Sequence, residues 1–172
     1  MTSAKYRNGS REESIYYSMA DTYLGKLVVA YTEKGLCAVT VVDSSQAGEE
    51  YLRNEFPKAI LSESEDHQNY IESIMAYLRG SKVDIPMDLA GTEFQLRVWS
   101  ALRTIPFGST VTYGEVASMI GDSLAVRAVA NACARNPVPL IIPCHRVIRK
   151  NGELGGYGLG IDRKKKLLEQ EG

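Results

Sequence analysis

Three short runs of apolar, aromatic and β-branched residues lie near the start of the chain, at residues 15–19, 27–32 and 36–42. Polar stretches rich in Asp, Ser, Thr, Lys and Gly follow these runs, and residues of this kind are typical of tight turns. The pattern predicts three strands that form an antiparallel meander.

The apolar positions then change to a spacing of three and four residues, which predicts helices. Residues 46–56 form one such segment, which ends before Pro57, and residues 70–78 form a second. We expect both helices to cover one face of the sheet. Residues 81–90, which contain a proline, are interpreted as a linker to a second domain.

The second half of the chain predicts mainly helices. Residues 92–95 and 112–115 both have the sequence pattern of a helix-opening capping box. The first would open a helix that runs to Ile105, and the second would open a short helix that ends at Ile120. A glycine turn separates this short helix from a third one over residues 123–134. Two short helices joined by a tight turn are typical of a helix-turn-helix, although many helical hairpins bind nothing.

Composition places the chain among ordinary globular proteins. Of its 172 residues, 44% are hydrophobic and 24% are charged, which suits one domain or two small ones. The odd count of three cysteines argues for a reducing compartment and against a disulfide framework. No apolar run reaches the length that crosses a bilayer, and residues 1–12 are polar enough for a disordered tail. We therefore expect a cytoplasmic protein that has no membrane partner.

Charge divides the chain into two unlike halves. The net charge is −1 overall, but residues 1–90 carry a net −5 and residues 91–172 a net +4. A basic surface attracts nucleic acid, so the second half is the candidate DNA-binding half.

Metal binding is not expected in the first half. Cys37 is interpreted as a small buried hydrophobic residue, and together with His67 it would supply too few ligands for a structural metal ion.

The candidate chemistry lies in residues 137–148, an apolar stretch with three prolines that contains Cys144 and His145. The thiolate is the reactive form of cysteine, and apolar burial raises the thiol pKa, so a buried Cys144 needs a proton acceptor. Adjacent side chains on an extended backbone point to opposite faces, so we expect His145 to act through a bridging water while a carboxylate holds its other nitrogen. An inert buried cysteine beside a hydrogen-bonded histidine is the alternative.

The residues around this pair form a longer pattern. The pattern consists of Asn-Pro-Val-Pro at 136–139, Ile-Pro-Cys-His-Arg-Val at 142–147, Thr-Tyr-Gly-Glu at 112–115, Arg-Ala-Val at 127–129 and Gly-Gly-Tyr at 155–157. Together they resemble the O6-alkylguanine-DNA alkyltransferases of bacterial type, which move an alkyl group from DNA to their own cysteine.

The resemblance implies an α+β fold of two domains. The first would be a small antiparallel-sheet and helix domain over residues 13–80, similar to ribonuclease H. Residues 81–90 would follow as a linker. The second, over residues 91–172, would be mainly helical and similar to a winged helix-turn-helix.

The resemblance also implies repair by direct reversal, in which a methyl or other alkyl group passes once from O6 of guanine, or less well from O4 of thymine, to Cys144. His145 would act through a water as the base of Cys144, and Glu171 would be the carboxylate partner of His145. Asn136 would tie the turn that leads to Cys144. Tyr113 would donate its hydroxyl to a ring nitrogen of the flipped guanine. Neither a cofactor nor a metal is implied.

Further residues would bind the base and its substituent. Backbone carbonyls of Cys144 and Val147 would accept from the exocyclic amine, and the alkyl pocket would be walled by Pro139, Tyr157, Gly158 and Leu159. Some relatives carry glycine where this chain has Leu159. We therefore expect methyl groups to react readily and benzyl groups less well.

The implied partner is double-stranded DNA that contains an alkylated base, with no obligate protein partner. Arg127 would enter the base stack from the minor groove after the damaged base has swung out, which offsets part of the cost of unstacking. The other implied DNA contacts are Gln95, Asp122, Ala125, Ala128, Asn131, Arg135 and Lys150.

Two alternatives belong to other functional classes. Non-catalytic relatives flag alkylated bases for another pathway, but they lack the acceptor thiol that Cys144 supplies. A helix-turn-helix regulator would carry Cys144 as an unreactive core residue.

Overall fold

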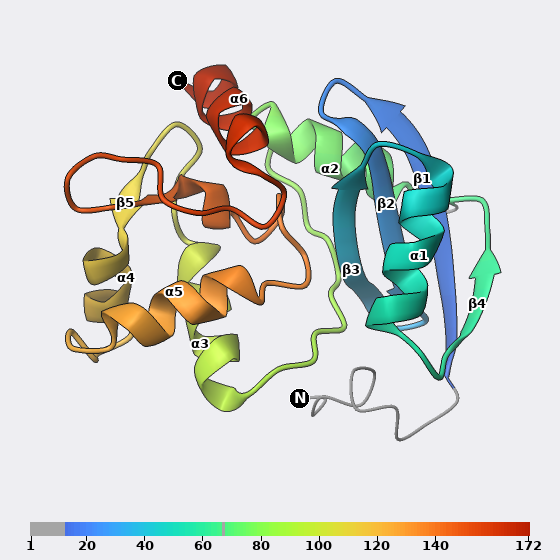
Figure 1. The fold of residues 1–172 in the computed structure, drawn as a ribbon, viewed down its shortest axis with the longest axis horizontal. Coiled ribbons are helices and arrows are strands. Elements are labelled where there is room, and N and C mark those ends of the chain that lie inside the picture. Colours follow the sequence, from blue (N-terminus) through green and yellow to red (C-terminus); the bar gives the residue numbers. More distant parts are fainter. Residues whose placement is uncertain (1–12, 67) are drawn as a thin grey trace. The chain divides into compact units, whose positions relative to one another are not determined.

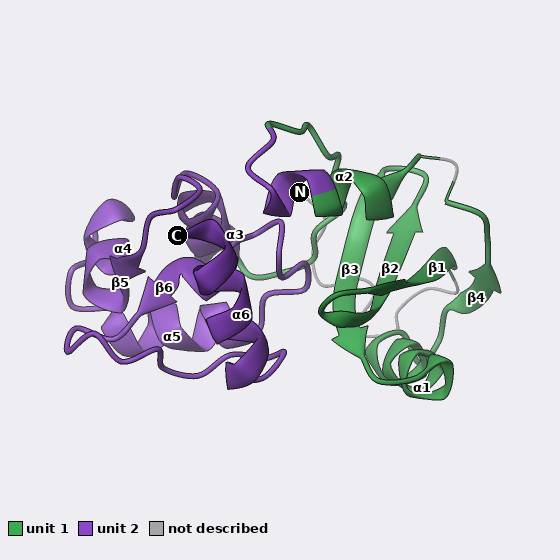
Figure 2. Ribbon diagram, turned by 90° about the horizontal axis from the view of Figure 1, so that it is seen from above, with its two compact units in different colours: residues 1–75, 82–92 green, residues 76–81, 93–172 purple. Residues whose placement is uncertain are grey.

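The computed structural model describes residues 13–66 and 68–172, which form two compact units (Figure 1, Figure 2). Unit 1 contains the described residues up to Met75 together with residues 82–92, and unit 2 contains residues 76–81 and 93–172. The chain therefore passes from one unit to the other three times. The expected tail at residues 1–12 and the residue His67 lie outside the described part of the chain.

Unit 1 is built on a four-stranded sheet in the order β3-β2-β1-β4. The antiparallel meander of β1 (Ser14–Thr22), β2 (Gly25–Thr32) and β3 (Gly35–Val42) confirms the sequence prediction. The fourth strand, β4 (Ile60–Glu63), pairs parallel to β1 and was not predicted.

Helices α1 (Ser45–Glu55) and α2 (Tyr70–Leu78) lie on opposite faces of this sheet, and the expectation that both cover one face is wrong (Figure 2). Leu52 of α1 packs in a core cluster with Ala30 of β2. The next residue, Tyr31, points to the other face, where its ring lies 5.1 Å from the ring of Tyr70 in α2. Both faces of β2 are therefore buried.

The segment interpreted as a linker instead extends the edge of β3. The amide of Leu36 donates to the carbonyl of Pro86 at 2.9 Å, and the amide of Asp88 donates to the carbonyl of Leu36 at 2.8 Å. Gly35 makes this approach possible, because a Cβ at position 35 would lie 2.5 Å from the Pro86 backbone. Residues 82–92 thus pack as part of unit 1.

Unit 2 is mainly helical, as predicted. Its elements are α3 (Glu93–Leu102), β5 (Val111–Thr112), α4 (Tyr113–Met119), α5 (Val126–Ala134), the 3₁₀ turn η1 (Cys144–Arg146), β6 (Val147–Ile148) and α6 (Ile161–Glu171). The short strands β5 and β6 pair in parallel. Across residues 13–66 and 68–172, no helix is long and apolar enough to cross a membrane.

Helices α4 and α5 form the expected helix-turn-helix. The capping box of α4 is present: the Thr112 hydroxyl accepts from the Glu115 amide at 3.1 Å, and the Thr112 amide donates to the Glu115 carboxylate at 2.8 Å. Helix α5 begins at Val126, three residues later than predicted. The buried Trp99 of α3 donates its indole N–H to the Ala132 carbonyl at 2.9 Å, which fixes α5 against α3.

Candidate active site

Helix α5 presents three faces with different surroundings. Val129 and Ala132 are buried in the core of unit 2. Arg127, Ala128 and Asn131 are exposed to solvent. The remaining face carries Ala130, Cys133 and Ala134, which line a cavity. One helix therefore joins an exposed surface to an internal site.

The cavity has a volume of about 350 Å³ and contains both cysteines of unit 2. Its lining residues are Tyr113, Ala130, Cys133, Ala134, Cys144, Gly156, Tyr157 and Gly158. The lining is largely apolar, and it includes the phenols of Tyr113 and Tyr157 and the buried thiol of Cys144, all three of which were predicted. It suits a flat ring with a small apolar substituent better than a charged ligand.

Cys144 begins the turn η1, so its backbone is not extended as expected. Its amide donates to the carbonyl of Ile142 at 2.7 Å, and its side chain is almost completely buried. Burial raises the pKa of the Cys144 thiol, whereas a hydrogen bond from Asn136 and the charge of Lys164 act to lower it. The thiol is therefore held in an apolar site beside two groups that favour its thiolate.

Asn136 ties together the turn between α5 and Cys144. Its side-chain amide N–H donates to the carbonyl of Ile142 at 2.8 Å and to Sγ of Cys144 at 3.2 Å, and its oxygen accepts from the Val138 amide at 2.9 Å. These bonds hold a segment in which Leu140, fully buried, has a φ of 80°. Bulky residues rarely adopt this conformation, so the turn is fixed by its contacts rather than by its local preference.

His145 is buried and bonded to the penultimate residue. Its Nε2 lies 2.9 Å from Oε1 of Glu171. Because a carboxylate only accepts, Nε2 carries the proton and Nδ1 keeps a lone pair. Nδ1 is buried and makes no hydrogen bond within the described part of the chain. Burial lowers the pKa of His145 more than Glu171 raises it, which keeps the ring neutral at neutral pH.

Glu171 also forms a buried ion pair with Arg146, which the sequence analysis did not single out. Arg146 Nε donates to Oε2 at 2.9 Å and Nη2 donates to Oε1 at 2.8 Å. Burial alone would raise the pKa of Glu171, but the hydrogen bonds from His145 and Arg146 outweigh it and hold this pKa at about 2. The carboxylate therefore stays ionised and orients His145 throughout the neutral range.

Arg146 is in turn fixed by the end of α2 and by the loop after α3. Its Nη1 donates to the Tyr77 hydroxyl at 3.0 Å and to the Ile105 carbonyl at 2.8 Å. The guanidinium also lies over the rings of Tyr77 and Phe107, at 5.2 and 5.9 Å. Tyr77 was not predicted, because an aromatic residue in an amphipathic helix is interpreted as an ordinary core residue.

A buried lysine, Lys164 of α6, holds the loop on the other side of the cavity. Its Nζ donates to the carbonyls of Val147 at 2.7 Å, Gly156 at 3.3 Å and Leu154. Burial lowers the pKa of Lys164, and the thiols of Cys144 and Cys133 act to raise it. Val147 was predicted to accept from a bound base through this same carbonyl.

Tyr113 reaches the cavity from the first turn of α4, and the loop passes close to it at Gly155. A Cβ at position 155 would lie 3.2 Å from the Tyr113 hydroxyl, and φ is 73° there. Only glycine fits both conditions without strain. The Tyr113 hydroxyl therefore has a defined place in the cavity wall.

Not all predicted wall residues reach the cavity. Tyr157 and Gly158 do, but Leu159 and Pro139 are buried and are not among its lining residues. Leu159 therefore does not line the cavity directly, whereas Cys133 and Tyr157 do. Cys133 was missed because an uncharged residue in a helix carries no chemical pattern; burial raises its pKa to about 12.

The residues predicted to contact DNA lie on several elements of unit 2. Arg127, Ala128 and Asn131 share the exposed face of α5, and Asp122 is exposed in the turn before it. Ala125 is the partly exposed N-cap of α5. Arg135 and Lys150 are exposed at the end of α5 and after β6, and Gln95 is partly buried in α3. Asp122, Ala125, Ala128 and Asn131 therefore lie within five positions of Arg127 along the chain.

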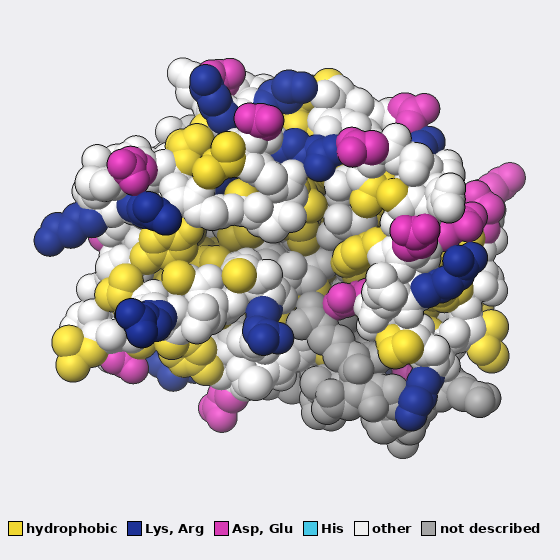
Figure 3. Space-filling view, viewed as in Figure 1, with side chains coloured by type: hydrophobic (Ala, Val, Ile, Leu, Met, Phe, Trp, Pro, Cys, Tyr) yellow, Lys and Arg dark blue, Asp and Glu magenta, His cyan; other side chains and the backbone are white. Residues whose placement is uncertain are grey.

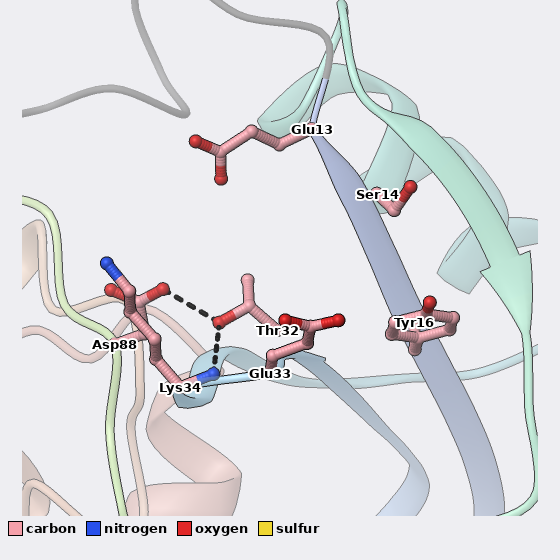
Figure 4. A pocket seen from close by; sticks show the side chains of 7 residues that line it. All are labelled: Glu13, Ser14, Tyr16, Thr32, Glu33, Lys34 and Asp88. Carbon is pink, nitrogen blue, oxygen red and sulfur yellow. Dashed lines mark hydrogen bonds between the residues drawn. The ribbon is translucent and has the colours of Figure 1, made fainter.

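A second cavity, of about 300 Å³, lies in unit 1 (Figure 4). Its lining includes the acidic residues Glu13, Glu33 and Asp88 and the basic residue Lys34, and the Thr32 hydroxyl donates to Asp88 at 2.7 Å. It contains neither a cysteine nor a histidine. The described residues contain no group of three or more His, Cys, Asp or Glu side chains placed to hold a metal ion.

A helix-turn-helix unit that holds a buried thiol beside an oriented histidine defines a class of proteins with a nucleophilic cysteine. Comparison with known families agrees with this class. Residues 93–172 match the DNA-binding domain of 6-O-methylguanine DNA methyltransferase, and residues 15–90 match its ribonuclease-like domain. The chain belongs to this family.

Individual relatives cover most of the chain. A methylated-DNA–protein-cysteine methyltransferase of Mycolicibacterium paratuberculosis is 41% identical over 91% of this chain and 92% of its own length. The bifunctional transcriptional activator and DNA repair enzyme Ada of Escherichia coli is 42% identical over 99% of this chain, but the chain spans only 49% of Ada. A crystal structure of Mycobacterium tuberculosis OGT in complex with DNA matches with a TM-score of 0.76 and 37% identity, covering 91% of this chain and 92% of that one.

Proposed function

We propose that this protein repairs DNA by direct reversal, moving a methyl or other alkyl group from O6 of guanine, or less well from O4 of thymine, to Sγ of Cys144. The observation that carries the proposal is the position of Cys144 in the wall of an apolar cavity, bonded to Asn136 and next to the His145–Glu171 pair. The names of the relatives support the same reaction.

The base must leave the duplex before it can react. A substituent on a stacked base cannot reach a buried thiol, so the nucleotide has to swing into the cavity. The exposed face of α5 suits a minor-groove contact, because Ala125 and Ala128 allow a close approach and Arg127 can fill the vacated place in the stack. Asn131, Gln95, Asp122, Arg135 and Lys150 would lie near the DNA around this contact.

Proton transfer would run from the Cys144 thiol through one water to Nδ1 of His145, the lone pair that faces no protein partner. Glu171 stabilises the imidazolium that forms, since it already accepts from Nε2. The thiolate then attacks the saturated carbon in line, forming a C–S bond as the C–O bond breaks.

The leaving purine would be stabilised by the cavity wall. Tyr113 would donate its proton to a ring nitrogen of the base, so that the purine does not leave as an anion, and the carbonyls of Cys144 and Val147 would accept from the exocyclic amine. The product is a thioether, which no residue of this site can cleave. Each molecule would therefore act once, without a cofactor.

We propose that the chain acts as a monomer in the cytoplasm on double-stranded DNA that contains alkylated bases, with no obligate protein partner. The intact mass of the protein after incubation with a duplex containing one O6-methylguanine tests the reaction, with Cys144→Ala alongside. Wild type should gain one methyl group and the variant none. Tight binding of the lesion duplex without a mass gain would instead indicate a lesion-flagging protein.

A further inference from the structure

Exposed apolar side chains gather at the turn of the helix-turn-helix. The described residues expose seven large hydrophobic side chains, and three of them lie between residues 119 and 126. Met119 is 47% exposed, Val126 is 40% exposed and Leu124 is 94% exposed. We call these three residues the apolar turn. Single exposed apolar residues are common on proteins, but this grouping within eight positions needs a cause.

Leu124 could have been buried against its own helix. It precedes the N-cap Ala125, and Val129 occupies the fourth position of α5. These are the two positions of a hydrophobic staple, in which the side chains pack together and fix the entry of the chain into the helix. Val129 is fully buried, whereas Leu124 points to solvent. Leu124 therefore contributes little to the stability of α5.

The surroundings of the apolar turn favour an anionic partner. Arg127 follows directly, and the N-cap Ala125 makes no side-chain bond to the helix amides. The first turn of α5 carries no acidic side chain, and the exposed Asp122 is the one acidic residue between positions 119 and 127. The amino-terminal end of a helix is electropositive. Figure 3 shows hydrophobic and basic side chains next to one another in the region where Figure 1 places α5 and the turn before it.

Double-stranded DNA combines these properties in its minor groove. Phosphates line the edges of the groove, and the C–H groups of the deoxyriboses form its walls. Proteins that bind this groove often use leucine, methionine or another apolar side chain beside arginine. A protein partner would need a broader apolar surface than three side chains provide.

We propose that Leu124, flanked by Val126, is a second DNA-contacting group that packs on the deoxyriboses of the minor groove next to the step that Arg127 enters. The inference rests on the proposed DNA repair function and adds a contact that is not ionic. Ionic contacts weaken at high salt because releasing counterions from the DNA then gains less entropy, whereas burial of an apolar side chain does not depend on salt in this way. The contribution of Leu124 to the free energy of DNA binding should therefore be the same at low and high salt.

Affinity for an undamaged duplex, measured from 50 to 200 mM salt, tests the proposal with Leu124→Ala and Leu124→Lys. Leu124→Ala should bind about tenfold more weakly at every salt concentration, which corresponds to partial burial of one leucine side chain. The slope of log K against log salt should not change. Leu124→Lys should steepen this slope by about 1, because a lysine at the groove adds one phosphate contact.

Ile60→Ala is the matched control, because Ile60 is also an exposed aliphatic residue, at 56%, and lies in unit 1. It should bind as wild type does, and all three variants should melt at the wild-type temperature. Wild-type affinity of Leu124→Ala at every salt concentration, or an unchanged slope for Leu124→Lys, would overturn the proposal.

A methyl-transfer assay distinguishes failure of the Leu124 contact from failure of the proposed repair function on which the inference rests. Leu124→Ala should still accept one methyl group when the O6-methylguanine duplex is saturating, because Leu124 does not line the cavity. Wild type that neither binds duplex DNA nor gains a methyl group would overturn the proposed function. If wild type binds duplex DNA and gains a methyl group, but Leu124→Ala has the same affinity as wild type, only the proposed contact at Leu124 is overturned.

Discussion

At the scale of single residues, Glu171 has two tasks that rest on one carboxylate. It accepts from His145 and thereby fixes which ring nitrogen carries the proton, and it neutralises the buried Arg146. Removing one partner of a buried ion pair is more costly than losing the interaction itself, because the other charge remains buried without compensation. The same residue is therefore expected to serve both reactivity and stability.

Glu171→Gln should lower the free energy of unfolding by about 3 to 5 kcal/mol, because Arg146 then has no counter-charge. It should also slow methyl transfer, since glutamine does not stabilise the imidazolium. Urea unfolding and single-turnover methyl transfer measure the two effects. Glu169→Gln is the control: Glu169 is exposed and forms an ion pair with Lys165 at 4.0 Å. Unfolding of Glu171→Gln at the wild-type urea concentration would contradict the expected role.

Acid should destabilise the protein in two stages. The folded-state pKa of His145 lies below its ordinary 6.5, so the unfolded chain binds a proton first as the pH falls through 6.5. The pKa of Glu171 is about 2 when folded and 4.5 in its ordinary range, so a second loss occurs between those values. Urea unfolding at pH 7, 5.5, 4 and 3 should show full stability above pH 6.5 and a progressive decrease below it. Equal stability at pH 7 and pH 4 would disprove this.

At the scale of elements, local signals were predictable and long-range pairings were not. The capping box at residues 112–115 depends on neighbours in sequence, and the structure contains it. Strand β4 has only four residues and gains its pairing from β1, about 46 positions away, which no local pattern shows. The burial of both faces of β2 could have been predicted from the sequence, because residues 27–31 are continuously apolar, as expected of a strand buried on both faces.

Helix α6 shows why the site was only partly predictable. Its buried positions are Lys164, Leu167 and Glu171, which share one face at helical spacing, but two of the three are charged. Charged residues are rarely buried, so the sequence pattern of residues 161–171 indicates an exposed polar segment and not a helix that packs on one face. Glu171 was found through family resemblance, whereas Lys164 had no equivalent signal because its three acceptors are backbone carbonyls.

Lys164→Met should lower the free energy of unfolding by about 2 to 4 kcal/mol, since methionine keeps the volume but leaves buried carbonyls without a donor. Hydrogen exchange over residues 147–156 should become faster, because the ammonium joins both ends of that loop. Lys165→Met is the control, since that side chain is 68% exposed. Equal protection of the loop in Lys164→Met and wild type would rule out the role of Lys164 as its anchor.

At the scale of the whole molecule, the proposed reaction would change the core that holds Cys144. Cys144 is 7% exposed, and Asn136 donates a hydrogen bond to its sulfur. A methyl group adds volume to this packed site and converts the sulfur into a thioether, which accepts hydrogen bonds only weakly. Protein that has reacted therefore differs from unreacted protein in packing as well as in chemistry.

Methylated protein should be less stable than unreacted protein by about 1 to 3 kcal/mol, the usual cost of overpacking a core. Thermal unfolding before and after complete reaction measures the difference, and Cys144→Ala incubated with the same duplex controls for bound DNA. An unchanged melting temperature after methylation would show that the cavity accommodates the added group without strain.

The path of the chain limits where recombination could exchange one domain of this protein for the domain of a relative. Residues 76–81 belong to unit 2 although residues before and after them belong to unit 1, and Tyr77 from this short segment bonds to Arg146. A recombination joint just before residue 93 would transfer the cysteine, the histidine and the glutamate but would leave the Tyr77 hydroxyl behind. The two halves are therefore expected to be inherited together, because a crossover at the apparent domain border separates Arg146 from one of its supports.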